Sequence, residues 1–231
     1  MDNMVKRHFE EEAKEFDRII WKLIPYYPQM VKSLIAAIPF RSSEPIKAID
    51  LGCGTGTISK AIKEIYPYAS LTCIDLANNM IRMAEAKLAA YSDICFQVAD
   101  FYNYEFDRVY DVVVSSLALH HLETDADKKG FYKKIYENLS IGGIFYNADV
   151  VLGASGHLQI IYMNQWKEFM SREVSKDEIE NNWITKYYEE DRPAALINQL
   201  EWLHDIGFSN IDVLWKYYNF AVFGGQKIKS G

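Results

Sequence analysis

A short apolar segment that runs directly into three closely spaced glycines constrains this chain more than any other feature of its sequence. Residues 46–51 have the character of a buried strand, Gly52, Gly54 and Gly56 follow, and apolar residues then return at helical spacing over 58–65. A strand, a tight turn and a helix form the repeating unit of parallel α/β sheets. Glycines let the backbone turn sharply and let a ligand approach the chain closely. The sequence therefore predicts an α/β fold with a ligand site at this turn.

The alternation of strands and helices continues to residue 151. Further strands are predicted over residues 70–74, 94–98, 109–115 and 144–151, with helices over residues 78–90 and 126–139. This order implies a doubly wound, Rossmann-like parallel sheet with helices on both faces.

The end of the chain breaks this alternation. A helix predicted over residues 193–206 is followed by two strands, 210–215 and 218–223, with almost nothing between them. So short a connection permits antiparallel pairing only. We therefore expect a sheet of seven strands that ends in a C-terminal antiparallel hairpin.

A chain of 231 residues can bury one substantial core without splitting into independent units. We expect a single domain over residues 1–231 with four parts. These are an N-terminal helical cap (residues 1–44), a core that contains the glycine turn (45–152), an inserted helical lid (153–192), and the last helix with the hairpin (193–231). The cap and the lid are inferred from apolar residues at helical spacing.

Composition excludes several classes of function. The net charge of −7 and the lack of a dense Lys/Arg cluster disfavour a nucleic-acid partner. No apolar run approaches the roughly 20 residues of a membrane span, and the start of the chain lacks a secretory signal, so we expect no membrane partner and a cytoplasmic protein. The three cysteines, Cys53, Cys73 and Cys95, are widely spaced and have no partner at zinc-binding distance, so we expect free thiols.

The glycine turn does not follow the dinucleotide-binding pattern. The G-x-G-x-x-G fingerprint would need a glycine at position 57, which is Thr57, or at position 59 if counted from Gly54, which is Ser59. Asp50 precedes the first glycine by two residues. The segment from Asp50 to Gly56 thus has the form acidic-x-G-x-G-x-G.

That form resembles the first motif of the class I S-adenosyl-L-methionine (SAM)-dependent methyltransferases, a family whose Rossmann-like sheet also ends in a hairpin. The resemblance extends over residues 46–226 and implies SAM as the cofactor. It implies that Gly52, Gly54 and Gly56 lie against the methionine part of SAM. It also implies that Asp50 orders the loop and the ligand's ammonium group. A tight turn without a ligand is the alternative.

Residues at the ends of later strands extend this resemblance. Asp75 and Leu76 follow the second strand, where an acidic side chain can accept both ribose hydroxyls; capping the next helix is the alternative for Asp75. Asp100 and Phe101 match the position that reads and covers the adenine, and core packing is the alternative for Phe101. Ser116 faces the mouth of the cleft.

Two adjacent histidines, His120 and His121, follow the fourth strand in a His-His-Leu stretch that resembles small-molecule methyltransferases. Histidine suits proton removal near neutral pH, so either could act as a general base; a satisfied structural histidine is the alternative. We expect no metal here, because neighbouring side chains diverge and no third ligand can be placed.

Four residues are candidates for binding the acceptor. Asn147 and Asp149 lie at the end of the fifth strand, where loop capping is the alternative. Tyr162 and Trp166 lie in the lid and could form an aromatic pocket, although core packing is the alternative.

We expect in-line methyl transfer to an unidentified small molecule, by a monomer or homodimer. One alternative is chemistry like that of the carboxy-SAM synthases, which the tail KYYNFAVFGGQK faintly resembles. A non-catalytic SAM-binding regulator and a nicotinamide oxidoreductase are the others.

Overall fold

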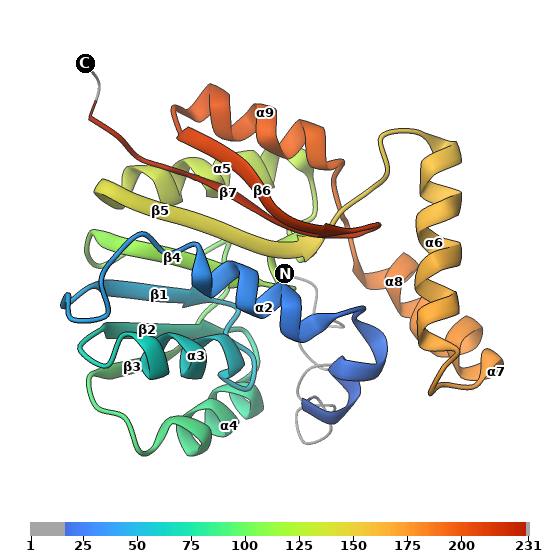
Figure 1. Cartoon of the computed structure of the whole chain (residues 1–231), viewed down its shortest axis with the longest axis horizontal. Coiled ribbons are helices and arrows are strands. Elements are labelled where there is room, and N and C mark those ends of the chain that lie inside the picture. Colours follow the sequence, from blue (N-terminus) through green and yellow to red (C-terminus); the bar gives the residue numbers. More distant parts are fainter. Residues whose placement is uncertain (1–16, 230–231) are drawn as a thin grey trace.

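The sheet has seven strands, and it occupies the centre of the molecule (Figure 1). The structure is a computed structural model that describes residues 17–229. Across the sheet the strands follow the order β3-β2-β1-β4-β5-β7-β6. Their bounds are β1 Lys47–Leu51, β2 Ser70–Asp75, β3 Ile94–Val98, β4 Tyr110–Ser116, β5 Leu139–Val150, β6 Ser209–Tyr217 and β7 Phe220–Gln226. The predicted Rossmann-like α/β sheet with a terminal hairpin is confirmed.

The first five strands are parallel, and β1 lies between β2 and β4. Leu51, the last residue of β1, pairs with Ile74 on one side and Ser115 on the other. The strand order reverses direction beside β1, and the loops on the two sides of such a point leave a crevice at the carboxyl edge of the sheet. The fold therefore places the glycine turn at the edge where α/β sheets bind ligands.

The two C-terminal strands join the sheet in an order that the sequence did not predict. β7 pairs antiparallel with β5, and β6 pairs with the other side of β7. The last strand of the chain, β7, therefore lies between β5 and β6, and β6 forms the edge of the sheet. Gly224 makes this possible, because a Cβ atom at that position would lie 1.9 Å from the carbonyl oxygen of Phe145 on β5. The close approach of the two backbones excludes any side chain there.

Helices cover both faces of the sheet (Figure 1). One face carries α2 Tyr27–Ala36, α3 Thr57–Ile65 and α4 Asn78–Leu88, and the other carries α5 Asp125–Glu137 and α9 Leu196–Ile206. Each layer contributes its own buried apolar cluster. Helix α9 ends at Gly207 as predicted but begins at Leu196 rather than at residue 193.

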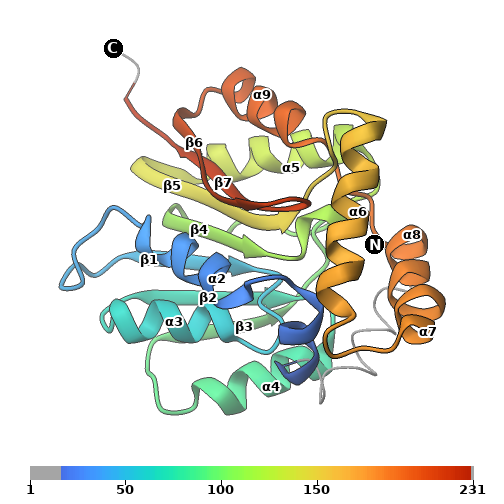
Figure 2. The ribbon, with the colours of Figure 1, turned by 45° about the vertical axis from the view of Figure 1, so that its right-hand side comes forward.

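The inserted block stands off the carboxyl edge of the sheet (Figures 1 and 2). It consists of α6 Gly156–Met170, α7 Lys176–Glu178, a π-helical stretch over Ile179–Ile184 and α8 Thr185–Glu190. Trp166 of α6 donates its indole N–H to the carbonyl of Leu23 at 2.7 Å, which ties the block to the helix over residues 17–23. The first part of the predicted cap helix lies outside the described residues. None of the described helices is both long and apolar enough to cross a membrane.

Candidate functional site

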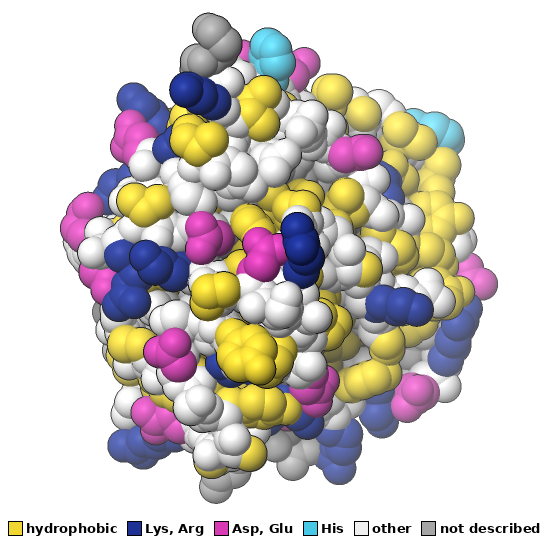
Figure 3. Space-filling model, turned by 60° about the vertical axis from the view of Figure 1, so that its left-hand side comes forward, with side chains coloured by type: hydrophobic (Ala, Val, Ile, Leu, Met, Phe, Trp, Pro, Cys, Tyr) yellow, Lys and Arg dark blue, Asp and Glu magenta, His cyan; other side chains and the backbone are white. Residues whose placement is uncertain are grey.

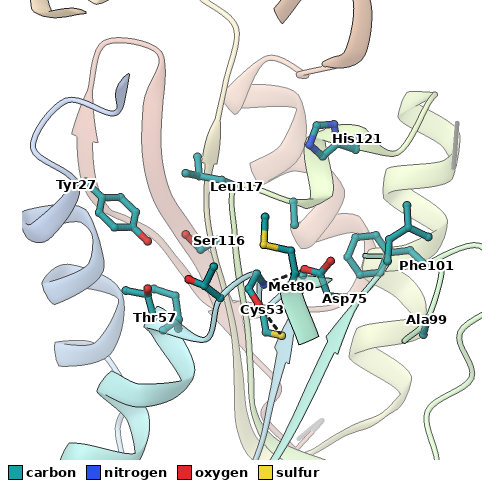
Figure 4. A pocket seen from close by; sticks show the side chains of 16 residues that line it. Tyr27, Cys53, Thr57, Asp75, Met80, Ala99, Phe101, Ser116, Leu117 and His121 are labelled. Atoms are coloured by element: carbon teal, nitrogen blue, oxygen red, sulfur yellow. Dashed lines mark hydrogen bonds between the residues drawn. The ribbon is translucent and has the colours of Figure 1, made fainter. Parts of the chain in front are cut away.

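A cleft of about 720 Å³, counting its open mouth, lies at the carboxyl ends of β1, β2 and β4 (Figure 4). It contains the glycine turn and most of the residues predicted to bind the cofactor. Its lining consists of Tyr27, Gly52, Cys53, Gly54, Thr55, Thr57, Ile58, Asp75, Leu76, Met80, Ala99, Phe101, Ser116, Leu117, Ala118 and His121.

The glycines of the turn have different roles. Gly52 and Gly54 line the cleft and have positive φ angles of 73° and 52°, a region that side chains with a Cβ disfavour. A Cβ at Gly52 would lie 2.3 Å from the Cβ of Ala118. Gly56 does not line the cleft; it has φ 84° and lies so close to α4 that a Cβ would approach Ala84 within 3.1 Å. The predicted ligand contact of Gly56 is therefore not found, and its role is helix packing.

Asp75 holds the glycine turn in place. Its carboxylate accepts the backbone N–H groups of Gly54 and Ala77, each at 2.9 Å, and its side chain also lines the cleft. Ala77 is the residue that precedes α4, so the Asp75 side chain binds the start of this helix and also lines the cleft. Leu76 lies beside it in the lining.

Asp50 lies beneath the turn and does not line the cleft. It is fully buried, and its Oδ2 accepts the hydroxyl of Ser59 at 2.6 Å. Burial raises the pKa of Asp50 to about 7; the Ser59 hydrogen bond opposes this, and the charge of Asp75 adds to it. Asp50 lies below the loop that it was expected to order. Because its carboxylate is outside the cleft lining, a direct contact with the ligand's ammonium group is not available to it, and a contact through water stays a prediction.

The predicted adenine-reading pair is split. Phe101 lines the cleft and also packs its ring 5.2 Å from that of Phe131, so it is both wall and core. Asp100 is outside the lining, and its carboxylate accepts the backbone N–H of Tyr102 at 3.0 Å. Ala99 occupies the lining in its place (Figure 4). Ser116 lies in the lining as expected, with the Tyr27 hydroxyl directed toward it (Figure 4).

A second cleft of about 800 Å³, again counting its mouth, lies between the sheet edge, the helix over residues 17–23 and the inserted block. Leu117 and His121 line both clefts. The full lining is Ile19, Ile20, Leu23, Ile24, Leu117, His120, His121, Val150, Trp166, Trp183, Lys186, Tyr187, Glu190, Asp191 and Phe220. Most of these side chains are apolar or aromatic.

The two histidines come together rather than diverge. They lie in a single 3₁₀ turn, Leu119–His121, with ring centroids 4.0 Å apart. Asp191, at the end of α8, brings its Oδ1 within 3.4 Å of His120 Nε2 and 3.6 Å of His121 Nδ1. The expectation of diverging rings without a third ligand is therefore wrong. The Glu-Glu-Asp run that ends in Asp191 gave no signal of this, because it has the composition of a solvent-facing helix end.

The electrostatic environments of the two rings are opposite. Burial alone lowers the pKa of each histidine. For His120 the carboxylates of Asp149 and Asp191 outweigh burial and raise the pKa to about 10. For His121 burial and the neighbouring charge of His120 lower the pKa to about 4, with Asp191 opposing them. In the protein alone at neutral pH, His120 is protonated and His121 is neutral.

Asn147 and Asp149 support the histidines from behind. Both are buried and neither lines a cleft, so the predicted contact with an acceptor is not found. Asp149 accepts the backbone N–H of His120 at 3.1 Å and lies 2.5 Å from its Nδ1. Asn147 donates to Asp149 at 3.2 Å and to the Tyr132 hydroxyl at 3.3 Å.

Of the two aromatic candidates in the lid, one lines a cleft and the other does not. Trp166 lines the second cleft, with its ring packed against Tyr187 and Phe220. Tyr162 lines neither cleft; its hydroxyl accepts from Lys216 at 3.0 Å beside the hairpin.

Asp17, which the sequence did not mark as a candidate, makes contacts beside the first cleft. Asp17 accepts the hydroxyl of Thr55 in the glycine turn at 2.5 Å and pairs with Lys87 of α4 at 2.7 Å. These bonds attach the helix over residues 17–23 to the turn. No motif marks Asp17, because the contact joins segments far apart in the sequence.

The first cleft fits SAM by its chemistry. Its glycine cradle leaves no room for a side chain at Gly52, and an acidic group lies at the end of β2, where hydroxyl groups of a nucleoside could be accepted. Aromatic and thioether side chains, Phe101 and Met80, provide apolar walls.

Comparisons with known proteins agree with this geometry. A family model described as a methyltransferase domain matches residues 48–143. A carboxy-S-adenosyl-L-methionine synthase of Campylobacter fetus is 27% identical over 231 residues, which cover 95% of this chain and 94% of that protein.

Two solved structures share the fold. A putative methyltransferase of Haloferax volcanii, solved with the Trm112 methyltransferase activator, superposes with a TM-score of 0.70 at 18% identity, over 98% of this chain and 99% of that one. Human N-acetylserotonin methyltransferase in complex with SAM has a TM-score of 0.63 at 16% identity; the match covers 97% of this chain and 57% of that one. The matching domain model, the motif and the sheet together show a SAM-dependent enzyme with a methyltransferase domain of the class I type over residues 48–143.

Proposed function

We propose that this enzyme transfers the methyl group of SAM to a small molecule held in the second cleft. The observation that carries the proposal is that Leu117 and His121 line both clefts. A cofactor in the first cleft and an acceptor in the second would meet at these two side chains. Methyl transfer requires this, since the acceptor atom has to approach the methyl carbon in line with the sulfur.

The reaction needs little covalent help from the protein, because the sulfonium is already an activated leaving group. A lone pair of the acceptor attacks the methyl carbon, the carbon–sulfur bond breaks, and its electron pair stays on sulfur as S-adenosylhomocysteine forms. An acceptor atom that carried hydrogen also loses a proton, which the neutral imidazole of His121 or solvent water would take up. Correct placement of both reactants can supply an effective molarity of about 10⁵ to 10⁸ M. The inserted block and the N-terminal helix would keep water out of the reaction.

The two histidines have different places in this proposal. His121 is the residue expected to contact the reacting atoms, because it lies where the clefts meet. His120 lines only the second cleft and is held by Asp149, so it is expected to shape the acceptor site.

The second cleft suits a small acceptor with an apolar part. Trp166, Trp183 and Phe220 offer aromatic walls. On the face drawn in Figure 3, basic and acidic side chains are interspersed rather than gathered into a basic tract, and the net charge is −7. Both features favour a small molecule over a nucleic acid.

The names of the relatives raise a second candidate, the formation of carboxy-SAM. A reactant that carries an additional carboxylate calls for cationic side chains. In the lining of the second cleft, the cationic Lys186 and His120 are accompanied by the carboxylates of Glu190 and Asp191, so no excess positive charge remains for a further carboxylate. Like charges in a cleft of low dielectric repel strongly. The charge of this cleft therefore favours methyl transfer.

The test uses a substitution that fills the second cleft. Ile19→Trp places a larger side chain in its lining, whereas Ile160→Trp is the matched control on an exposed position of α6. The purified enzyme is incubated with SAM and a panel of small hydroxyl, amine, thiol and carbon acids, and products are identified by mass spectrometry. We expect S-adenosylhomocysteine and a methylated acceptor. Ile19→Trp should lose this turnover while it retains SAM binding, and Ile160→Trp should keep both.

Three results would count against the proposal. Accumulation of SAM that carries a carboxyl group would support the synthase chemistry instead. SAM binding without turnover of any acceptor would support a regulator. Full turnover by Ile19→Trp would place the acceptor outside the second cleft.

A further inference from the structure

We propose that His120, His121 and Asp191 form a binding site for a divalent transition-metal ion in the wall of the second cleft. Each offers one ligand atom, and these atoms all lie within 4.8 Å of one another. Two imidazoles and one carboxylate are the ligand set that iron, zinc and nickel ions accept in proteins, whereas magnesium and calcium prefer oxygen alone.

The distances from Asp191 to the two histidines agree with a shared ion. Ligands held at about 2.1 Å from a tetrahedral metal lie about 3.4 Å from one another. His120 Nε2 and Asp191 Oδ1 are 3.4 Å apart, and His121 Nδ1 and Asp191 Oδ1 are 3.6 Å apart. An ion could therefore be accommodated between these groups with only small movements of the side chains.

The histidine nearest the sheet already has the support that metal-binding histidines usually have. Asp149 lies 2.5 Å from His120 Nδ1, so this nitrogen is engaged and Nε2 is directed toward Asp191. A carboxylate behind a ligating imidazole fixes the ring and its tautomer. Asn147 donates to Asp149 and fixes that carboxylate in turn.

The backbone also holds the third ligand in position. Arg192, the residue after Asp191, donates its N–H to the carbonyl of His120 at 3.1 Å. This bond joins the end of α8 to the histidine turn directly beside Asp191. The loop does not have to rearrange to complete the ligand set.

Charge favours a cation at this place. Asp149 and Asp191 approach the same imidazole from opposite sides, and the cluster has two carboxylates for two histidines. A divalent ion between neutral imidazoles would balance both carboxylates. Lys186 and Glu190 also line this cleft and offset each other in formal charge.

All three proposed ligands line the second cleft, so the remaining coordination positions of the ion would face it. Open positions are typical of catalytic rather than structural metal sites. If the proposed function holds, an acceptor with an oxygen, nitrogen or sulfur ligand could bind the ion beside the methyl group. This role rests on the proposed function, but the binding of the ion does not.

Cobalt(II) is a suitable probe because its visible absorption reports imidazole and carboxylate ligation. The full chain, freed of metal by a chelator and dialysis, is titrated with Co²⁺ and, separately, with Zn²⁺ in a calorimeter. We expect one ion per chain. Asp191→Asn and His121→Gln should each weaken binding by about tenfold or more. His204→Gln, at an exposed histidine beside Asp205, is the matched control and should bind as the original protein does.

SAM titration and thermal unfolding of each variant show whether it is folded. Two variants are used so that one remains informative if the other does not fold. Absence of saturable Co²⁺ binding, or equal binding by both folded variants, would overturn the site and leave a hydrogen-bonded cluster. Metal binding without any methyl transfer would support the site and refute the proposed function. Full methyl transfer by the metal-free enzyme would overturn the role toward the acceptor.

Discussion

The clash at Gly52 gives a quantitative test of how the cofactor turn is built. A Cβ atom at Gly52 would lie 2.3 Å from the Cβ of Ala118, and the residue has φ 73°. Gly142 has a similar φ of 88° but no heavy atom within 4 Å of an added Cβ. Gly142→Ala therefore measures backbone strain alone, and Gly52→Ala measures strain together with the clash.

The expected costs follow from this comparison. A non-glycine residue in the left-handed region costs about 1 to 2 kcal/mol, which is the expected loss of stability for Gly142→Ala. Overpacking adds about 1 to 3 kcal/mol, so Gly52→Ala should lose about 2 to 5 kcal/mol. Ala118→Gly removes the opposing Cβ. The double substitution Gly52→Ala/Ala118→Gly should therefore recover about 1 to 3 kcal/mol relative to Gly52→Ala.

The assay is urea unfolding of the four proteins, with SAM affinity measured by calorimetry on the folded forms. Gly52→Ala should also weaken SAM binding, because both residues of the clash line the cleft. Gly142→Ala should leave the affinity unchanged. A Gly52→Ala variant no less stable than Gly142→Ala, or a double variant no more stable than Gly52→Ala, would rule out the clash with Ala118.

Two further predictions concern the acidic residues of the turn. Asp75→Asn replaces one acceptor of a backbone N–H by a donor, so it should lower stability by about 1 to 3 kcal/mol. It should also weaken SAM binding about tenfold or more by loss of a charged acceptor, as measured by calorimetry; unchanged affinity would remove Asp75 from the site. Burial raises the pKa of Asp50 from 3.8 to about 7, and the titratable groups around it include Asp75, Tyr27 and Cys53. Between these two pH values the folded protein therefore binds a proton that the unfolded chain has released. Between pH 4 and pH 7 this lowers stability as the pH rises, by up to about 4 kcal/mol at the upper end. Asp50→Asn should remove that part of the slope in urea unfolding without SAM, and identical slopes for the two proteins would contradict the assignment.

Local patterns in the sequence were sufficient for the fold and for most of the cofactor cleft. Strands and helices have different apolar periods, so the alternation from β1 to β5 could be read directly. Gly52, Gly54 and Asp75 are adjacent to strand ends, and parallel strands bring their carboxyl ends to one edge. Their meeting in one cleft followed from the topology alone.

The place of Asn147 and Asp149 depended on the tertiary structure. Both faces of β5 are buried, so apolar and polar residues do not alternate along it. The sequence of β5 therefore does not show which of its side chains pack against helices and which reach a cleft. Packing of α5 and Tyr132 against this strand decided that both polar groups lie behind His120. The hairpin presents the same difficulty, because either of its strands could have paired with β5.

The acceptor side of the site shows the division between sequence and structure. The sequence itself shows the two adjacent histidines and was sufficient to single them out as functional candidates. Their partner Asp191 lies in a different part of the chain, at the end of α8, and the contact forms only when the inserted block packs over the sheet edge. Local residue patterns carry the periodicity that determines strands, helices and turns. They do not carry the relative position of two such elements, which depends on how their side chains pack, and it was this packing that brought a third ligand to the two histidines.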